Sequence, residues 1–376
     1  MWSLKKDIQS LANNNNLPFL SIFDARDYKQ TFKDSGFIKD LSKLKTWTQE
    51  GKHGDMSFLE ANHEVRQDLS LILPNVKSVL MFLVPYALPK RLRRVKNAKG
   101  SQLDFEHAKK ESLLDKSLIA KYAHAKDYHK VLKKRMTVFS QDLIKHIGRE
   151  VDFRPVVDSV PFFERAHARE VGLGFIGKNT MLIKPGLGSY FFIASLFLSI
   201  EPEFIALKNN KTNPLHTLDC GQCQKCLHAC PTGAIESPYS LNAKKCLSYM
   251  TIEHRGQVDE KYLTYFSDTI FGCDICQDVC PYNFVANYFD IISEFKEKNK
   301  YLLKITARDV ATMTYDDYKK WFGGTALTRA KYGGLIRNAL YHLFAIKDKE
   351  LESILMMLAN HDEKLVRDVV KQLKGT

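Results

Sequence analysis

The chain has 376 residues, and its 44% hydrophobic and 26% charged content is typical of a protein with a buried core and two or three domains. Its 56 Lys and Arg residues against 43 Asp and Glu give a net charge of +13, which fits either a polyanionic partner such as a nucleic acid or simply a lysine-rich surface. The longest apolar stretch, residues 190–200, falls short of the roughly 20 that span a bilayer, and no charged-then-apolar leader is visible, so we expect no membrane association and a cytoplasmic location.

Residues 1–205 mix helical and strand-like patterns. Helical spacing opens the chain within residues 1–30 and returns at about 113–147. Apolar runs typical of buried strands occur at residues 17–23, 78–86, 155–157, 180–183 and 189–198. This mixture predicts an α+β fold, with an α/β-type domain over residues 1–205.

The densest basic run comprises residues 90–96 together with Lys99. It follows Pro89 and an apolar run, which favours a loop. We weigh two roles for it, a solvated linker and a loop that contacts phosphates.

Residues 158–180 combine many charged side chains with Gly172, Gly174 and Gly177, between two strand-like runs. Glycines allow unusual backbone dihedrals and let a bulky ligand approach the backbone closely. The alternative is a strand, a helix and a loop with capping charges, in which Asp158 is the N-cap of a helix over residues 159–169.

All eight cysteines lie between Cys220 and Cys280. The first four have the spacing C-x2-C-x2-C-x3-C-P, and the last three have C-x2-C-x3-C-P. A two-cluster ferredoxin has this spacing, and the fourth Cys of each of its runs ligates the other cluster. Ile270 stands where the second run lacks its first Cys, and Cys246 is the remaining thiol that can replace it.

The cysteine spacing therefore predicts a ferredoxin-like domain with two 4Fe–4S clusters over residues 206–295. Structural zinc prefers two separated Cys/His pairs and disulfides need an oxidising compartment, so both alternatives fit less well. Because every thiol is used, we expect no free catalytic thiol. The predicted ligands are Cys220, Cys223, Cys226 and Cys280 for one cluster, and Cys230, Cys246, Cys273 and Cys276 for the other.

Residues 296–376 show helical spacing. Residues 335–340 are echoed weakly at residues 365–370, which is the pattern of a HEAT-type repeat. An ordinary amphipathic tail explains one echo about as well. We expect an α-helical, HEAT-like C-terminal region.

Together these features resemble epoxyqueuosine reductase, a cobalamin-dependent iron–sulfur enzyme of tRNA modification. The resemblance spans about residues 1–345. Two departures stand out: Val160 lies where the family often has Ala or Gly, and the repeat in the tail is less complete. The matching segments, in family order, are residues 53–59, 126–129, 158–165, 174–179, 246–249, 321–323, 329–331 and 337–339.

The resemblance implies reduction of epoxyqueuosine to queuosine in the anticodon loop of tRNA. Electrons from an unidentified donor would pass through the clusters to cobalamin, and the epoxide oxygen would leave as water. Asp158 is implied as the proton donor. An acid that works at neutral pH needs a raised pKa, which burial against the corrin face would supply.

The same resemblance assigns further residues to the cofactor, while the basic surplus makes four residues our candidates for tRNA contact; we expect a monomer. Cobalamin would be contacted by Asp158, Arg66, Leu182, Ile193, Ser248 and Asp274. The tRNA would be contacted by Arg255, Arg329, Lys331 and Arg337.

Two other functions fit part of the sequence. A reductive dehalogenase-like enzyme uses the same cofactors on small molecules, but it usually carries an export leader and leaves the +13 charge unexplained. A non-catalytic electron carrier, a ferredoxin fused to a binding module, would bind no corrin. Cofactor analysis separates the carrier from the two enzymes, and a tRNA assay separates the enzymes from each other.

Overall fold

The computed structural model describes residues 2–18, 20–26, 28, 36–87, 90–91, 93–97, 100–104, 118–209, 218–285, 290–302 and 304–375. The chain divides into two compact units. The first comprises Met1–Pro89, Tyr128–Gln224 and Pro281–Ile292, and the second comprises Lys90–Asp127, Lys225–Cys280 and Ser293–Thr376. The predicted division into three domains, at 1–205, 206–295 and 296–376, stays a prediction.

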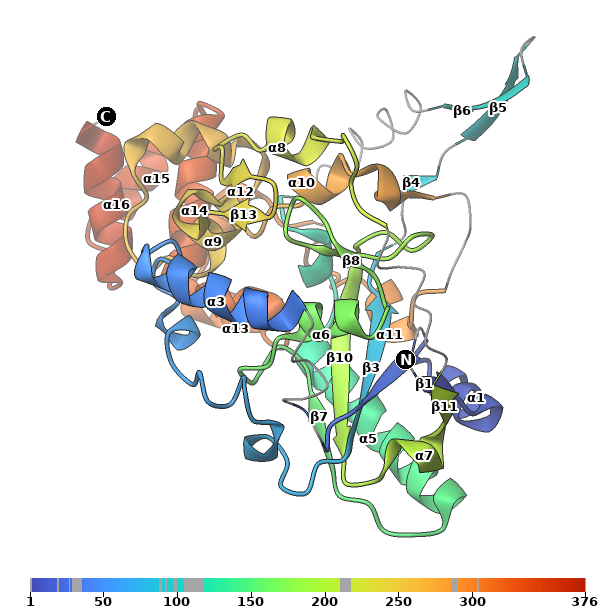
Figure 1. Ribbon diagram of the computed structural model, residues 1–376. Helices are drawn as coiled ribbons and strands as arrows, with labels where there is room; N and C mark the ends of the chain where they lie inside the picture. The colour runs from blue at the N-terminus through green and yellow to red at the C-terminus, as the bar shows by residue number, and fades with distance from the viewer. Residues whose placement is uncertain are drawn as a thin grey trace. The chain divides into compact units, whose positions relative to one another are not determined.

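The first unit is built on a four-stranded antiparallel sheet (Figure 1). Its strands lie in the order β2 (Leu20–Asp24), β3 (Ser78–Pro85), β10 (Phe191–Leu198) and β7 (Phe153–Val156). Every residue of β3 is buried. A strand buried on both faces needs apolar side chains at successive positions, which explains the continuous apolar run in the sequence.

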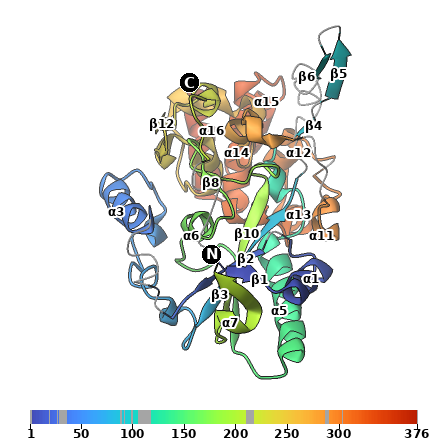
Figure 2. The same ribbon diagram turned by 45° about the vertical axis from the view of Figure 1, so that its right-hand side comes forward.

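Helices cover both faces of this sheet (Figure 2). Successive side chains of a strand point to opposite faces. Met81 faces the core to which α6 (Glu164–Glu170) contributes. Its neighbour Phe82 packs edge-on against Phe139 of α5 (Tyr128–Ile147), with 5.7 Å between ring centroids. The sheet therefore supports α6, and the loop before it, on a buried face.

Shorter elements complete the first unit. β1 (Trp2–Leu4) pairs with β11 (Ala206–Asn209), and β8 (Phe175–Ile176) pairs with β9 (Leu182–Ile183). The remaining helices are α1 (Lys6–Asn14), α3 (Gly36–Gln49) and α7 (Pro202–Ile205).

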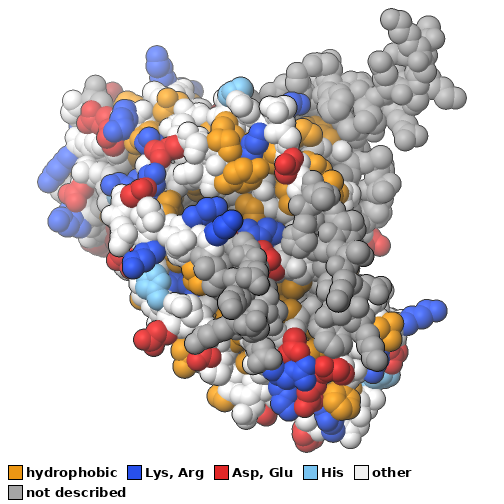
Figure 3. All heavy atoms as spheres, viewed as in Figure 1, with side chains coloured by type: hydrophobic (Ala, Val, Ile, Leu, Met, Phe, Trp, Pro, Cys, Tyr) orange, Lys and Arg blue, Asp and Glu red, His pale blue; other side chains and the backbone are white. Residues whose placement is uncertain are grey.

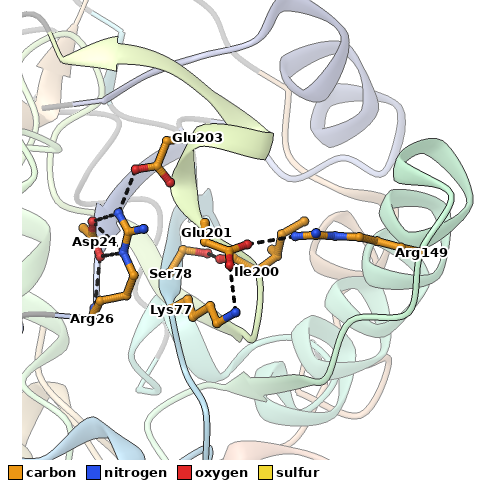
Figure 4. Close-up of polar contacts among 8 residues, drawn as sticks. All are labelled: Asp24, Arg26, Lys77, Ser78, Arg149, Ile200, Glu201 and Glu203. Atoms are coloured by element: carbon orange, nitrogen blue, oxygen red, sulfur yellow. Dashed lines mark hydrogen bonds and ion pairs between the residues drawn. The ribbon is translucent and has the colours of Figure 1, made fainter.

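An ion-pair network ties the loop after β10 to the start of β3 (Figure 4). Lys77 Nζ lies 2.8 Å from Glu201 Oε1, and Arg149 lies 2.9 Å from Glu201 Oε2. These cations, with a backbone hydrogen bond, lower the pKa of Glu201 to about 2. Nearby, Arg26 bridges two further carboxylates.

The second unit is mainly helical. Its cysteine-bearing part contains α8 (Lys225–Ala229), the β12 (Ile235–Ser237) and β13 (Ser240–Leu241) pair, α9 (Leu247–Ile252) and α10 (Ile275–Asp278). Its C-terminal part contains α11 (Ser293–Lys296), α12 (Ala307–Thr312), α13 (Tyr315–Phe322), α14 (Tyr332–Ala345), α15 (Leu351–Met357) and α16 (Lys364–Gly375).

Helix α14 is the centre of this second unit. All its residues from Gly333 to Leu343 are buried, because α12, α16 and the 3-10 segment Glu260–Asp268 pack around it. The helices before it begin with capping boxes, in which Thr306 and Thr314 each exchange hydrogen bonds with an Asp three residues later. The echo between residues 335–340 and 365–370 falls on α14 and α16, which pack together.

Most predicted elements of the first 205 residues are confirmed, and two are wrong. The apolar runs form β2, β3, β7, β9 and β10. The helix expected over residues 113–147 begins only at Tyr128; Lys121–Ala123 is a single 3-10 turn, and residues 113–117 lie outside the described part. The basic run is not a loop, because Lys90–Arg91 is strand β4 and Arg93–Asn97 is strand β5, paired with β6 (Gly100–Asp104).

The side chains of that basic run, with residues 92 and 99, lie outside the described part of the chain, so its phosphate-contact role stays a prediction. Within the described residues, no helix has the length and apolar character needed to cross a bilayer.

Candidate active site and cluster cysteines

Asp158 occupies a constrained position just after strand β7. Its φ of +46° is in the left-handed region, which non-glycine residues rarely adopt without support from their surroundings. Tyr128 Oη donates a 2.8 Å hydrogen bond to Asp158 Oδ2, and the Asp158 N–H donates to Glu164 Oε1 at 3.2 Å. One bond holds the carboxyl group and the other holds the backbone, while the residue stays exposed to solvent.

Asp158 is not the N-cap of a helix, so that alternative is wrong. Helix α6 begins at Glu164, its N-cap is Phe163, and no side chain caps it. The left-handed backbone at Asp158 turns the chain away from β7 before the helix starts.

Glu164, the first residue of α6, is the acid whose pKa is shifted most clearly. Burial, reinforced by the negative charge of Asp158, raises the pKa of Glu164 to about 8, against a smaller opposing effect from Arg165. At neutral pH the Glu164 carboxyl therefore carries a proton. The sequence analysis quoted Glu164 within a matching segment and gave it no role; its signal was a second acid six residues after Asp158.

Tyr128 links Asp158 to the sheet. Its ring stacks on Phe192 of β10, with centroids 4.1 Å apart and an interplanar angle of 5°. The stack fixes the hydroxyl that holds Asp158. Sequence reasoning assigned no role to Tyr128 either, although it lies in the segment 126–129 that carries the resemblance.

Three predicted cobalamin contacts share the core of the first unit. Arg66 is 3% exposed, and its guanidinium donates to Ala61 O at 2.7 Å. It also lies 5.7 Å from the ring of Phe163, which packs on the same core as Leu182 and Ile193. Burial lowers the pKa of Arg66.

Four apolar side chains of this region are only partly covered by the protein. Val160, Phe163, Ile176 and Ile193 pack against the core but remain only half-buried. Arg66 and Leu182, which belong to the same unit, are buried.

The other two predicted cobalamin contacts lie in the second unit. Ser248 is half-buried in α9, directly after Cys246. Asp274 Oδ2 accepts a 2.8 Å hydrogen bond from the Lys121 N–H and lies 3.6 Å from Lys121 Nζ. Burial raises the pKa of Asp274, and Lys121 opposes that rise.

The four cysteines predicted to hold the second cluster all lie in the second unit and influence one another electrostatically. Burial, together with the charges of Cys246 and Cys230, raises the pKa of Cys273 to about 12. The pKa values of Cys246 and Cys276 are raised for the same reasons. Thiols whose pKa is raised in this way lose their protons only when a positive counter-charge is present, and the iron of a cluster would provide one.

As placed, no three His, Cys, Asp or Glu side chains of the described residues form a group that could hold a metal ion. The ligand assignment therefore rests on the cysteine spacing and on the mutual influence of the thiols.

The glycine-rich loop between α6 and β9 is tightly packed. A Cβ atom on Gly174 would lie 2.4 Å from Ile183 O, and one on Gly177 would lie 2.5 Å from Ile183 Cδ1. These glycines serve close packing of the chain on itself, whereas the sequence analysis had also allowed for approach of a ligand.

We expect Gly174→Ala to destabilise the protein by about 1–3 kcal/mol, because the new methyl group would displace a backbone carbonyl. Thermal unfolding of the two proteins measures the change. Gly334→Ala is the matched control, because a Cβ there would meet nothing closer than 3.9 Å and alanine favours the helix. Equal melting temperatures for Gly174→Ala and the wild type would contradict the packing argument.

The predicted tRNA contacts occupy different environments. Arg337 is 1% exposed and donates to the carbonyl groups of Met250, His254 and Gly256, which marks it as a structural residue. Arg329 is exposed and pairs with Glu253 at 2.8 Å.

The last two candidates are also exposed. Arg255 donates to the carbonyl groups of Arg329 and Ala330, while Lys331 has a φ of +68° at the start of α14. On the face drawn in Figure 3, Lys and Arg side chains lie among Asp and Glu side chains. The surplus charge is therefore dispersed on that face.

Two family models match the chain in the regions described above. Residues 66–159 match the family described as "Epoxyqueuosine reductase QueG, DUF1730", and residues 219–283 match the "4Fe-4S double cluster binding domain". The first match contains Arg66, Tyr128 and Asp158, and the second contains all eight cysteines. The expected pair of 4Fe–4S clusters is thereby supported.

Curated relatives and solved structures point the same way. Epoxyqueuosine reductase from Cellulophaga algicola is 33% identical over 80% of this chain and 88% of its own. That from Leadbetterella byssophila is 32% identical over 91% of this chain and 99% of its own. A crystal structure of epoxyqueuosine reductase with an epoxyqueuosine-modified tRNA-Tyr stem loop shares the fold, with a TM-score of 0.77 and 24% identity over 98% of this chain and 89% of that one. This chain belongs to the epoxyqueuosine reductase family.

Proposed function

We propose that this protein reduces epoxyqueuosine to queuosine in the anticodon loop of tRNA, the final step of queuosine biosynthesis. The observation that carries the proposal is the exposed Asp158, whose carboxyl group is held by Tyr128 and whose N–H donates to Glu164. An electron carrier has no need of a fixed acid in this setting. Family membership over most of the chain supplies the substrate class.

The electron-transfer groups of the proposal are two 4Fe–4S clusters and cobalamin. Bound cobalamin would supply a strongly reducing metal centre. Cysteine spacing supports Cys220, Cys223, Cys226 and Cys280 as ligands of one cluster and Cys230, Cys246, Cys273 and Cys276 as ligands of the other. Cobalamin would be held by Asp158, Arg66, Leu182, Ile193, Ser248 and Asp274, with the half-buried Ile193 offering apolar surface.

The chain's own acids supply and position protons. Converting the epoxide to an alkene and water consumes two electrons and two protons. Asp158 Oδ2 is engaged by Tyr128, so Oδ1 is the atom that would deliver a proton to the departing oxygen. Glu164, neutral at pH 7, keeps a second negative charge away from that oxygen.

We also propose roles for the basic residues and for the domains of the chain. The exposed Arg255, Arg329 and Lys331 would contact tRNA phosphates, whereas Arg337 would support them from the interior. The first 205 residues would form an α/β-type cobalamin-binding domain, and the C-terminal region a HEAT-like array. The enzyme would act as a cytoplasmic monomer supplied by an unidentified low-potential electron donor.

A direct assay tests the function. Anaerobically reconstituted protein is incubated with cobalamin, dithionite and tRNA that contains epoxyqueuosine, and the nucleosides are weighed after digestion. We expect a mass decrease of one oxygen atom. Unchanged epoxyqueuosine, with both clusters and cobalamin shown to be loaded, would refute the tRNA substrate and favour a small-molecule reductase. Failure to bind cobalamin would instead favour an electron carrier.

Glu164 makes this activity pH-dependent. A carboxyl whose pKa is raised in the folded protein stays neutral up to that pKa. As the pH rises through the raised pKa, the carboxyl ionises in an environment that disfavours its charge. Above about pH 8 the ionised Glu164 faces Asp158, so we expect the single-turnover rate to fall there. Glu164→Gln keeps the acceptor oxygen for the Asp158 N–H and should remove this fall. An unchanged alkaline limb in Glu164→Gln would refute the assignment.

A further inference from the structure

Lys178 makes three hydrogen bonds to the segment that contains the first two cysteines. Its backbone N–H donates to Cys220 Sγ at 3.4 Å. Its Nζ donates to Gly221 O at 2.6 Å and to Cys223 O at 3.0 Å. One residue therefore contacts both a predicted ligand sulfur and the backbone that carries two predicted ligands.

The Lys178 ammonium group is a buried charge, and no anionic side chain in the described part of the protein pairs with it. The residue is 9% exposed, and within the described residues no carboxylate lies at ion-pair distance from its Nζ. Buried lysines are normally paired with an anion, because an isolated charge in the interior is costly. A cluster held by Cys220 and Cys223 would carry the missing negative charge.

The loop that carries Lys178 is hydrogen-bonded on both sides of this residue. Gly177 N donates to Met181 O at 2.8 Å, and Asn179 Oδ1 accepts from Met181 N at 3.2 Å. Arg165 of α6 donates to Thr180 O at 2.7 Å. Because hydrogen bonds fix the loop on both sides of Lys178, we expect the ammonium group to keep its position independently of residues 220–223.

We propose that Lys178 is a positioning residue that fixes residues 220–223 and raises the reduction potential of the cluster bound there. Reduction adds one electron and no proton, so the cluster becomes more negative. A nearby buried cation stabilises the reduced form more than the oxidised form, and the backbone N–H to sulfur hydrogen bond acts in the same direction. The inference rests on the cluster ligation that the proposed function includes.

Redox titration of the reconstituted holoprotein tests the inference. Dithionite supplies the electrons, and electron paramagnetic resonance follows each reduced cluster. We expect Lys178→Met to move the potential of one cluster to a more negative value and to leave the other unchanged. Lys178→Arg, which keeps the charge and the donors, should restore the wild-type value. Lys145→Met is the matched control, because it removes one exposed lysine from α5 in the same unit.

Lys178→Gln separates charge from positioning. Glutamine can still donate to a carbonyl group of residues 220–223 but carries no charge, so we expect both clusters to assemble and one potential to fall. Unchanged potentials in a fully loaded Lys178→Gln protein would overturn the proposal, even if Lys178→Met had lost iron. Iron and sulfide analysis of the wild type is a separate check: fewer than two clusters there would refute the ligation scheme and not the role of Lys178.

Discussion

Asp158→Asn should lower the rate of epoxyqueuosine reduction by about 10²–10⁴-fold, the usual contribution of a general acid. Asparagine has nearly the size of aspartate, and its oxygen can still accept the hydrogen bond from Tyr128. Its backbone N–H also keeps the contact with Glu164. The substitution therefore removes the acidic proton and leaves the constrained geometry in place. Single-turnover assays with saturating tRNA measure the loss directly.

Two controls make this result specific. Iron content should match the wild type, because Asp158 is not a cluster ligand. Cobalamin absorbance is measured as well, and the rate is expressed per loaded enzyme, because Asp158 is a predicted cobalamin contact. Tyr128→Phe should give a smaller loss, since it removes the hydroxyl that orients Asp158 and keeps the acid and the aromatic stack on Phe192. A near-normal rate in a loaded Asp158→Asn protein would move the proton-donor role to another group, with Glu164 the first to test.

Local patterns predicted much of the fold. The apolar run at residues 78–86 predicted a buried strand, because a strand covered on both faces is apolar throughout. Met81 and Phe82 face opposite sides of the sheet, as this prediction requires. The cysteine spacing predicted the two-cluster domain, since most ligands of a cluster lie close together along the chain. The matching family model covers these cysteines.

The errors came from contacts between distant residues. The alternative of an N-cap at Asp158 is wrong because α6 begins only at Glu164. The backbone of Asp158 is left-handed, and Tyr128, thirty positions earlier, bonds its carboxyl group. The basic run forms strands through the pairing of β5 with β6, which charge density does not predict. Lys178 was quoted within a motif, but only the folded chain shows that it contacts Cys220 and Cys223.

Arg337 is the sharpest example of this limit. A conspicuous arginine in a net-positive chain suggested phosphate contact. Its acceptors lie more than eighty positions away in sequence, in and just after α9. Asn338, beside it, accepts from the guanidinium and donates to the carbonyl groups of Thr251 and Ile270. The pair fastens α14 to the helix that follows Cys246.

Arg337→Met should destabilise the second unit by about 3–5 kcal/mol. Methionine fills much of the volume, but one buried and two partly buried carbonyl groups lose their charged donor, and a buried group left unsatisfied costs about 1–3 kcal/mol. Denaturant unfolding followed by circular dichroism and by cluster absorbance should show a lower midpoint. Cluster absorbance should be lost first, because the affected carbonyl groups lie close in sequence to Cys246.

Arg308→Met is the matched control. Arg308 is a partly exposed arginine paired with Asp348 at 2.9 Å, and exposed pairs contribute little to stability, so its midpoint should change much less. The competing role for Arg337 predicts a different pattern: unchanged unfolding with weaker tRNA binding that becomes less sensitive to salt. That pattern would return Arg337 to the tRNA surface and would require α14 to open when the tRNA binds.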